Sequence, residues 1–327
     1  MKKRMLAIVL CLSMTAVIVA GCSPATTGPT SQTTPTAPAT EKGPITVGSK
    51  IDTEGQVLGN IILQMLASKG FTVVDKTRTG TTEVVRKALV TGQIDAYPEY
   101  TASALTQFFA GTKVDPAVLK DAQKSYELVK TLDLTKNQID WLTPSPANNT
   151  WAVAIPQALA TSKNIKTLAD WAKYVNGGGT VKIAGSLEYF TRSDAFPAFE
   201  AAYGFKLKPA QELKLGGGDT SVTEKAASLG TSGVNAAMAY GTDGTISALK
   251  LVTLEDPKGV QPVYAPAPTF RDSVIKKYPE IATILDPVFA KLDTKTLQDL
   301  NGQVAVGGTD AKSVAITWLK ANGFLTK

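Results

Sequence analysis

Residues 82–105, TEVVRKALVTGQIDAYPEYTASAL, carry the pattern that decides the fold. Residues 82–92 place apolar side chains at helical spacing and end at Gly92, a residue type that commonly ends a helix. A strand-like run, IDAYPEY, follows and leads directly into another helical stretch. A helix, a strand and a second helix in such close succession predict an α/β fold.

The sequence on either side repeats this alternation. Strands are expected at 45–49 and 71–77, and a helix at 53–69, where Thr53 and Gln56 form a plausible capping box. A second unit of the same character begins near Trp151. Its expected strands and helices, with the helical C-terminal segment, are 150–155, 168–175, 180–186, 193–204, 235–240 and 311–324.

This order of elements predicts two α/β lobes with mostly parallel sheets, the second lobe inserted into the first. We assign residues 44–148 and 251–327 to the first lobe and residues 149–250 to the second. Small ligands are commonly bound in the cleft between two domains, so we expect a binding site there.

The N-terminus is typical of a bacterial lipoprotein. Residues 1–21 combine a basic start with a short apolar run, which indicates a signal peptide. The run ends in Val19-Ala20-Gly21-Cys22, and Cys22 is the expected lipidation site. Residues 22–43 are rich in Thr, Pro, Ala and Ser, a composition that cannot bury a core and predicts a disordered tether. We therefore expect an extracytoplasmic protein that is anchored to the cell membrane by lipid.

Composition disfavours catalysis, metal binding and nucleic-acid binding. The 327 residues include no histidine, which removes the commonest general base and metal ligand, and Cys22 is the single cysteine after residue 21. The glycine-rich runs 176–180 and 216–221 lack the features of phosphate loops. Loss of residues 1–21 lowers the net charge from +6 to +3, and no basic cluster remains. We expect no enzyme activity, no cofactor and no metal.

Four aromatic residues stand where a strand meets a loop or a helix: Tyr100, Trp151, Tyr240 and Tyr264. Each alone is more simply explained by packing, but strand ends are where α/β folds bind ligands. A quaternary ammonium group has no N–H to donate, whereas aromatic faces attract its charge. The four rings are therefore candidates for a cage around a methylated cation.

Six segments in order complete a resemblance to a known family: VGSKIDTE (47–54), GQIDAYPEYTASAL (92–105), NNTWAVAI (148–155), EYFTRSDAF (188–196), AYGTDG (239–244) and PVYAPAP (262–268). The chain resembles the substrate-binding proteins of osmoprotectant ABC transporters, which carry glycine betaine, choline or carnitine. The resemblance runs from about Pro44 to Phe324. It implies a two-lobed periplasmic-binding-protein fold (type II), a ligand in the inter-lobe cleft, and an ABC permease with its ATPase as partner.

The resemblance also implies roles for individual residues. Tyr100, Trp151, Tyr240 and Tyr264 would form the ammonium cage. Lys50, Ser103 and Arg192 would bind a carboxylate, so glycine betaine is expected to bind more tightly than choline. Trp151 and Ser103 replace a frequent tyrosine and threonine and keep the chemistry, but Asp52 replaces a frequent phenylalanine beside Lys50. Tyr97 has no role in this scheme.

Alternatives remain open at this point. Lys50 and Arg192 could instead be surface residues paired with Asp52 and Asp194. The ligand could be another small zwitterion or a related amine, such as choline, carnitine, an amino acid or a methylated histidine derivative. A surface enzyme with unrecognised catalytic groups is the remaining alternative. We expect a monomer.

Overall fold

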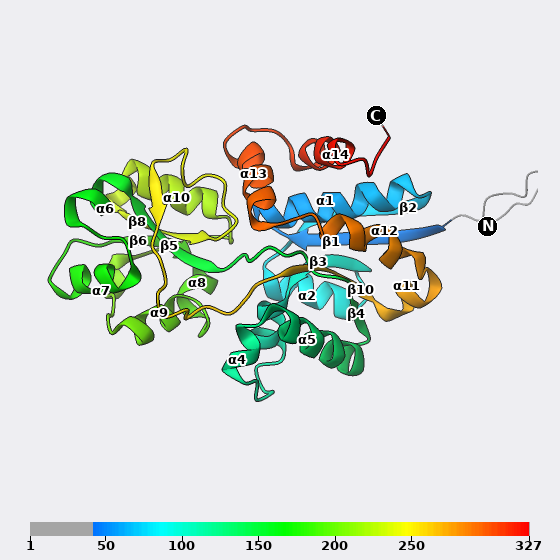
Figure 1. Ribbon diagram of the computed structural model, residues 1–327, viewed down its shortest axis with the longest axis horizontal. Helices are drawn as coiled ribbons and strands as arrows, with labels where there is room; N and C mark the ends of the chain where they lie inside the picture. Colours follow the sequence, from blue (N-terminus) through cyan, green and yellow to red (C-terminus); the bar gives the residue numbers. More distant parts are fainter. Residues whose placement is uncertain (1–41, 327) are drawn as a thin grey trace, which may run out of the picture. The chain divides into compact units, whose positions relative to one another are not determined.

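The computed structural model describes residues 42–326. Its strands form two five-stranded sheets (Figure 1). The first sheet has the order β2-β1-β3-β10-β4. Its strands are β1 (Lys42–Lys50), β2 (Phe71–Gly80), β3 (Ala96–Tyr100), β4 (Ile139–Trp141) and β10 (Pro266–Arg271). The second sheet has the order β7-β6-β8-β5-β9. Its strands are β5 (Trp151–Pro156), β6 (Ile183–Ser186), β7 (Glu212–Leu215), β8 (Ala236–Tyr240) and β9 (Leu251–Thr253).

The two sheets share one strand pattern. In the first sheet β1 pairs in parallel with β2 and β3, and β10 pairs antiparallel with β3 and β4. In the second sheet β6 pairs in parallel with β7 and β8, and β5 pairs antiparallel with β8 and β9. One strand in each sheet therefore runs against the other four. The α/β prediction with mostly parallel sheets is confirmed.

Helices cover both faces of the first sheet (Figure 1). Its helices are α1 (Thr53–Ser68), α2 (Thr82–Val90), α3 (Thr101–Ser103), α4 (Pro116–Leu119), α5 (Ala122–Asn137), α11 (Asp272–Lys277), α12 (Glu280–Phe289), α13 (Thr294–Ala305) and α14 (Ala311–Ala321), with a π-helical turn η1 (Ala104–Phe108) after α3. One face packs against α1 and α12–α14, and the other against α2 and α5. Among the described residues, none of these helices combines the length and apolar character that a membrane crossing needs.

The second sheet is covered in the same way. Its helices are α6 (Gln157–Lys163), α7 (Leu168–Asn176), α8 (Leu187–Thr191), α9 (Phe196–Tyr203) and α10 (Thr220–Leu229), with short 3₁₀ turns η2 (Pro209–Gln211) and η3 (Thr231–Gly233). Helix α10 packs on β6 and β8 through small residues such as Ala226, Ala184 and Ala237, which let the helix lie close to the sheet. The opposite face packs against the aromatic side chains of α7 and α9.

Helix α1 shows how local sequence sets these elements. Val57, Leu58 and Ile61 are fully buried against the first sheet, as their helical spacing predicts. The capping prediction was wrong by one residue. Asp52, not Thr53, is the N-cap, and its carboxylate accepts the Gly55 N–H at 2.6 Å. An aspartate acceptor in this position also places negative charge at the positive end of the helix.

Strand β10 was missed because prolines disfavour a strand assignment. Pro266 and Pro268 nevertheless lie in the middle of the sheet, opposite Tyr100 and Pro98 of β3. Their carbonyls accept from the backbone N–H groups of Ser145 and Leu142, in the connection after β4. In an antiparallel strand the carbonyl and the amide nitrogen of a residue face the same side. The prolines therefore lack N–H groups only on the side where β4 has already ended.

Two connections join the sheets, residues 142–150 and 254–265. They are hydrogen-bonded to each other, because Asn149 N–H donates to the Tyr264 carbonyl at 3.0 Å and Tyr264 N–H donates to Asn148 Oδ1 at 2.9 Å. This pairing fixes Trp151, which follows the first connection, near Tyr264, which lies in the second. Strand β9 belongs to the second sheet, although residues from 251 onward were assigned to the first lobe.

Candidate functional site

A cavity of about 840 Å³ is lined by elements of both sheets. Its size is within the usual range for small-molecule sites. All the residues that the sequence pointed to for ligand binding line this one cavity: Lys50, Tyr100, Ser103, Trp151, Arg192, Tyr240 and Tyr264. They come from β1, β3, α3, β5, β8, the turn after α8 and the second connection. Residues far apart in the sequence are thus brought to one cavity.

Two of the aromatic rings stack on each other. Trp151 begins β5 and Tyr240 ends β8, and the two residues are register partners. Their ring centroids lie 4.6 Å apart with planes inclined by 41°. Tyr189 packs against Trp151 from α8, at 5.3 Å between centroids. The pair therefore forms a rigid aromatic wall whose orientation is set by sheet pairing.

The other two rings are held by their hydroxyls. Tyr100 OH donates to Glu54 Oε1 at 2.7 Å, and Tyr264 OH donates to Asp194 Oδ2 at 2.6 Å. Burial, followed by the nearby carboxylates, raises the pKa of both hydroxyls well above the usual value, so both remain neutral donors. Each ring can therefore present its face to the cavity with a fixed orientation.

Cations of the protein lie over two of these rings. Lys50 Nζ is 4.8 Å from the centroid of Tyr100, and Arg192 Cζ is 5.4 Å from that of Trp151. The rings of Tyr100 and Trp151 thus each lie next to a positive charge of the protein itself, in the geometry of a cation–π contact.

Glu54 does not line the cavity but holds two residues that do, Tyr100 and Asn149, and sequence reasoning missed it. It lies in the first turn of α1, is 4% exposed, and accepts from Tyr100 OH and from Asn149 Nδ2 at 2.9 Å through Oε1. Its Oε2 accepts from Asn301 Nδ2 at 2.8 Å, and the same nitrogen donates to the Thr242 carbonyl. Burial raises the pKa of Glu54. The available signal was an acidic residue at the start of an otherwise apolar helix.

Lys50 is paired with Glu99 rather than with Asp52. Lys50 Nζ lies 2.7 Å from Glu99 Oε1, and Glu99 is fully buried. Glu99 also accepts from Tyr97 OH at 2.8 Å and from the Tyr100 N–H at 2.7 Å. Tyr97, which had no assigned role, therefore orients the carboxylate that holds Lys50.

Asp52 also lines the cavity. Burial raises the pKa of its carboxyl to about 6, although the Gly55 N–H and the Lys50 charge oppose the shift. With this pKa the carboxyl gains a proton as the pH falls below about 6, so the negative charge at the cavity decreases in acid.

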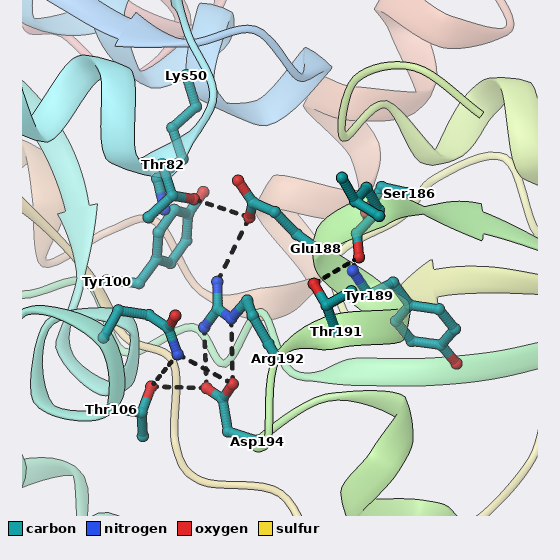
Figure 2. Close-up of polar contacts among 12 residues, drawn as sticks. Lys50, Thr82, Tyr100, Thr106, Ser186, Glu188, Tyr189, Thr191, Arg192 and Asp194 are labelled. Atoms are coloured by element: carbon teal, nitrogen blue, oxygen red, sulfur yellow. Dashed lines mark hydrogen bonds and ion pairs between the residues drawn. The ribbon is translucent and has the colours of Figure 1, made fainter. Parts of the chain in front are cut away.

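Arg192 is buried and bound to Asp194, its sequence neighbour (Figure 2). Nε and Nη2 donate to the two carboxylate oxygens at 3.1 and 2.8 Å. Asp194 also accepts from Thr106 Oγ1 at 2.6 Å and from Gln107 Nε2 at 3.3 Å, both from η1 of the first lobe. Burial alone would raise the pKa of Asp194, but these hydrogen bonds, chiefly from Arg192, hold it below its usual value. The anticipated pair exists, but it is buried at the cavity and is not a surface pair.

A protein-family model for the substrate-binding domain of ABC-type glycine betaine transport systems matches residues 43–321. The chain belongs to this family. Members of this family are ABC substrate-binding proteins, which bind a small ligand outside the cytoplasm and deliver it to a permease. The predictions of a transport function and of no enzyme activity are therefore confirmed.

Individual members support the assignment. The glycine betaine-binding protein YehZ of Escherichia coli is 56% identical over 287 residues, which cover 88% of this chain and 93% of that protein. The solved structure of apo YehZ matches with a TM-score of 0.64 and covers 86% of this chain and 99% of its own. Lactococcal OpuAC, solved in its closed-liganded conformation with glycine betaine, matches at 16% identity with a TM-score of 0.58, covering 86% of this chain and 97% of its own. The predicted two-lobed fold is confirmed.

Proposed function

We propose that this ABC substrate-binding protein binds a compact quaternary ammonium osmoprotectant, glycine betaine first, in the cavity between its two sheets. The observation that carries the proposal is that the four aromatic and three polar residues expected to bind such a ligand line a single cavity. The 56% identity to a glycine betaine-binding protein supports the same ligand.

The ammonium end of the ligand is assigned to the aromatic residues. Each well-placed ring contributes about 0.5–2 kcal/mol to cation binding, depending on desolvation. Trp151 and Tyr240 provide a wall of two packed, mutually tilted rings, and Tyr100 and Tyr264 provide rings fixed through their hydroxyls. The ring orientations are fixed before the ligand enters, which favours affinity, and the ammonium would share the Tyr100 and Trp151 rings with Lys50 and Arg192 or displace them.

The carboxylate end is assigned to Lys50, Ser103 and Arg192. Ser103 follows Tyr100 in α3, is 3% exposed and lines the cavity. Glu99 and Asp194 hold the two cations in place. A ligand carboxylate would bind to the donors that these partners leave free, and would regain there the hydrogen bonds that it loses with water.

The remaining assignments extend the proposal to the whole chain. Residues 44–148 with 251–327, and residues 149–250, would act as the two lobes that close on the ligand, except that residues 251–253 of β9 would belong to the second lobe. Residues 1–21 would be the signal peptide, Cys22 the lipidated N-terminus, and residues 22–43 the tether. These N-terminal features lie outside the described residues, except that Lys42 and Gly43 belong to β1 and not to a disordered tether. The protein would act as a monomer and present its ligand to the permease from a membrane anchor.

Titration calorimetry of the purified protein with glycine betaine, choline, carnitine and proline tests the proposal. We expect saturable binding of glycine betaine, and proton NMR should find the ligand unchanged after incubation. Binding of proline alone among the four would replace the aromatic-cage assignment, and conversion of the ligand would favour an enzyme.

A further inference from the structure

Glu188 extends from α8 into the cavity and meets the opposite lobe (Figure 2). Its Oε2 accepts a hydrogen bond from Thr82 Oγ1 of α2 at 3.1 Å. The same oxygen lies 3.6 Å from Arg192 Nη1. A carboxylate of the protein therefore lies at the cavity, between the arginine assigned to the ligand and a hydroxyl of the facing lobe.

Arg192 keeps part of its donor capacity for a ligand. Asp194 takes the N–H of Nε and one N–H of Nη2. One N–H of Nη2 and both of Nη1 remain, and Nη1 lies 3.6 Å from Glu188 Oε2. A ligand carboxylate that binds at Nη1 therefore meets the negative charge of Glu188.

The two acidic partners of Arg192 differ in their freedom to move. The Asp194 side chain is 7% exposed and accepts from both lobes, whereas the Glu188 side chain is 31% exposed. Glu188 is the easier of the two to move, because it is more exposed and lies 3.6 Å from the arginine, against 2.8 Å for Asp194. Asp194 fixes the arginine, and Glu188 is the partner that a ligand can displace.

We propose that Glu188 is a specificity-determining residue that reduces the preference of the cavity for carboxylate-bearing amines. This inference rests on the proposed function. A zwitterion such as glycine betaine must displace Glu188 from Nη1 or accept its repulsion. A cation such as choline gains from the same negative charge. Glu188 thus reduces the difference in affinity between glycine betaine and choline that Lys50 and Arg192 would otherwise create.

The Glu188→Gln variant tests this role. Glutamine keeps the length of the side chain, and its amide oxygen can still accept from Thr82, so the contact between the lobes is retained. We expect the ratio of the choline Kd to the glycine betaine Kd to rise at least about threefold over wild type, in line with the modest strength of a partly exposed charge pair. Calorimetry at one low salt concentration measures both ligands.

Glu83→Gln is the matched control. Glu83 lies in the first turn of α2, lines the same cavity, and is exposed. Glu83→Gln removes one negative charge from the cavity, as Glu188→Gln does, but Glu83 has no contact with Arg192. The ratio of the choline Kd to the glycine betaine Kd should therefore stay near the wild-type value. Thr82→Val removes the hydrogen bond between Thr82 and Glu188 across the cavity. It should change the Kd of choline and the Kd of glycine betaine by a similar factor.

The outcomes separate the two proposals. If the wild type binds either ligand and Glu188→Gln leaves the ratio unchanged, or Glu83→Gln changes it equally, the role of Glu188 is overturned while the proposed function stands. If the wild type binds neither ligand, both proposals fall. Unfolding curves without ligand should show that Glu188→Gln remains folded.

Discussion

Trp151 and Tyr240 face each other across the antiparallel strands β5 and β8, with ring centroids 4.6 Å apart. Both strands are in the second sheet, so this part of the cavity wall belongs to that lobe. Tyr100 and Tyr264 reach the same cavity from the first sheet and from the connection between the sheets. A ligand that contacts all four rings would therefore link the two lobes.

The Tyr240 ring should contribute directly to binding. Tyr240→Ala is expected to weaken glycine betaine binding by at least about 1 kcal/mol, because a cation–π contact and ring packing are lost. Tyr240→Phe keeps the ring and should bind nearly as well as wild type. Calorimetry measures both variants. Unchanged affinity in the alanine variant would exclude Tyr240 from the site, and an equal loss in both would assign the effect to the hydroxyl.

Asp194 should stabilise the fold as well as the site. Asp194→Asn removes the buried charged partner of Arg192 and leaves only the more distant Glu188, and breaking a buried pair costs about 3–5 kcal/mol. We expect urea unfolding to show a loss of about that size at neutral pH. Asp121→Asn, at an exposed pair with Lys124 on α5, should change stability little.

The cost of Asp194→Asn should also depend on pH. The folded state holds the pKa of Asp194 below its usual value, so the stabilisation is present above the unfolded pKa and is lost as pH falls through the folded pKa. The difference between wild type and variant should therefore shrink in acid. A difference that stays constant down to strongly acid pH would contradict the buried ion pair.

The pH dependence of stability that Asp52 causes should be opposite to that of Asp194. Burial raises its pKa from 3.8 to about 6, so the folded protein retains a proton that the unfolded chain releases. Its contribution to stability is present below the unfolded pKa and is lost as pH rises through about 6. Asp52→Asn keeps a good N-cap and cannot titrate.

Urea unfolding without ligand, repeated across this pH range, measures the Asp52 effect. The stability of Asp52→Asn relative to wild type should increase as pH rises from about 4 to about 7, because only the wild type must ionise a buried carboxyl. A relative stability that does not change with pH would show that Asp52 titrates normally.

Cys22 is predicted to anchor the protein. Cys22→Ser should remain unprocessed or appear in the soluble fraction, because no lipid can be attached. Membrane fractionation with metabolic lipid labelling measures both properties. A Cys22→Ser protein that is still cleaved after Gly21 and fractionates with membranes like wild type would contradict the lipoprotein prediction.

The alternation of strands and helices could be predicted because local patterns specify it. Buried apolar residues at helical spacing located α1, and short alternating runs located β1 and β5. Strand β10 could not be found in this way. The positions of Pro266 and Pro268 in the sheet are acceptable only because β4 ends beside them, which is a tertiary fact.

The residues that line the cavity were more predictable than the hydrogen-bond and ion-pair partners that hold them. The resemblance to a family carried the positions of Tyr100, Trp151 and Arg192, all of which line the cavity. It could not show that Lys50 pairs with Glu99, or that Glu54 holds Tyr100. Such partners are chosen by the distances between elements far apart in the chain, and no local spacing encodes them.

The placement of β10 between β3 and β4 has a consequence for synthesis and export. All strands of the second sheet lie within residues 151–253, whereas the first sheet needs residues 266–271 to join β3 to β4. A chain that emerges from its N-terminus can therefore assemble the later-encoded lobe first. The first sheet stays incomplete at its centre until residues 266–271, in the last fifth of the chain, are synthesised.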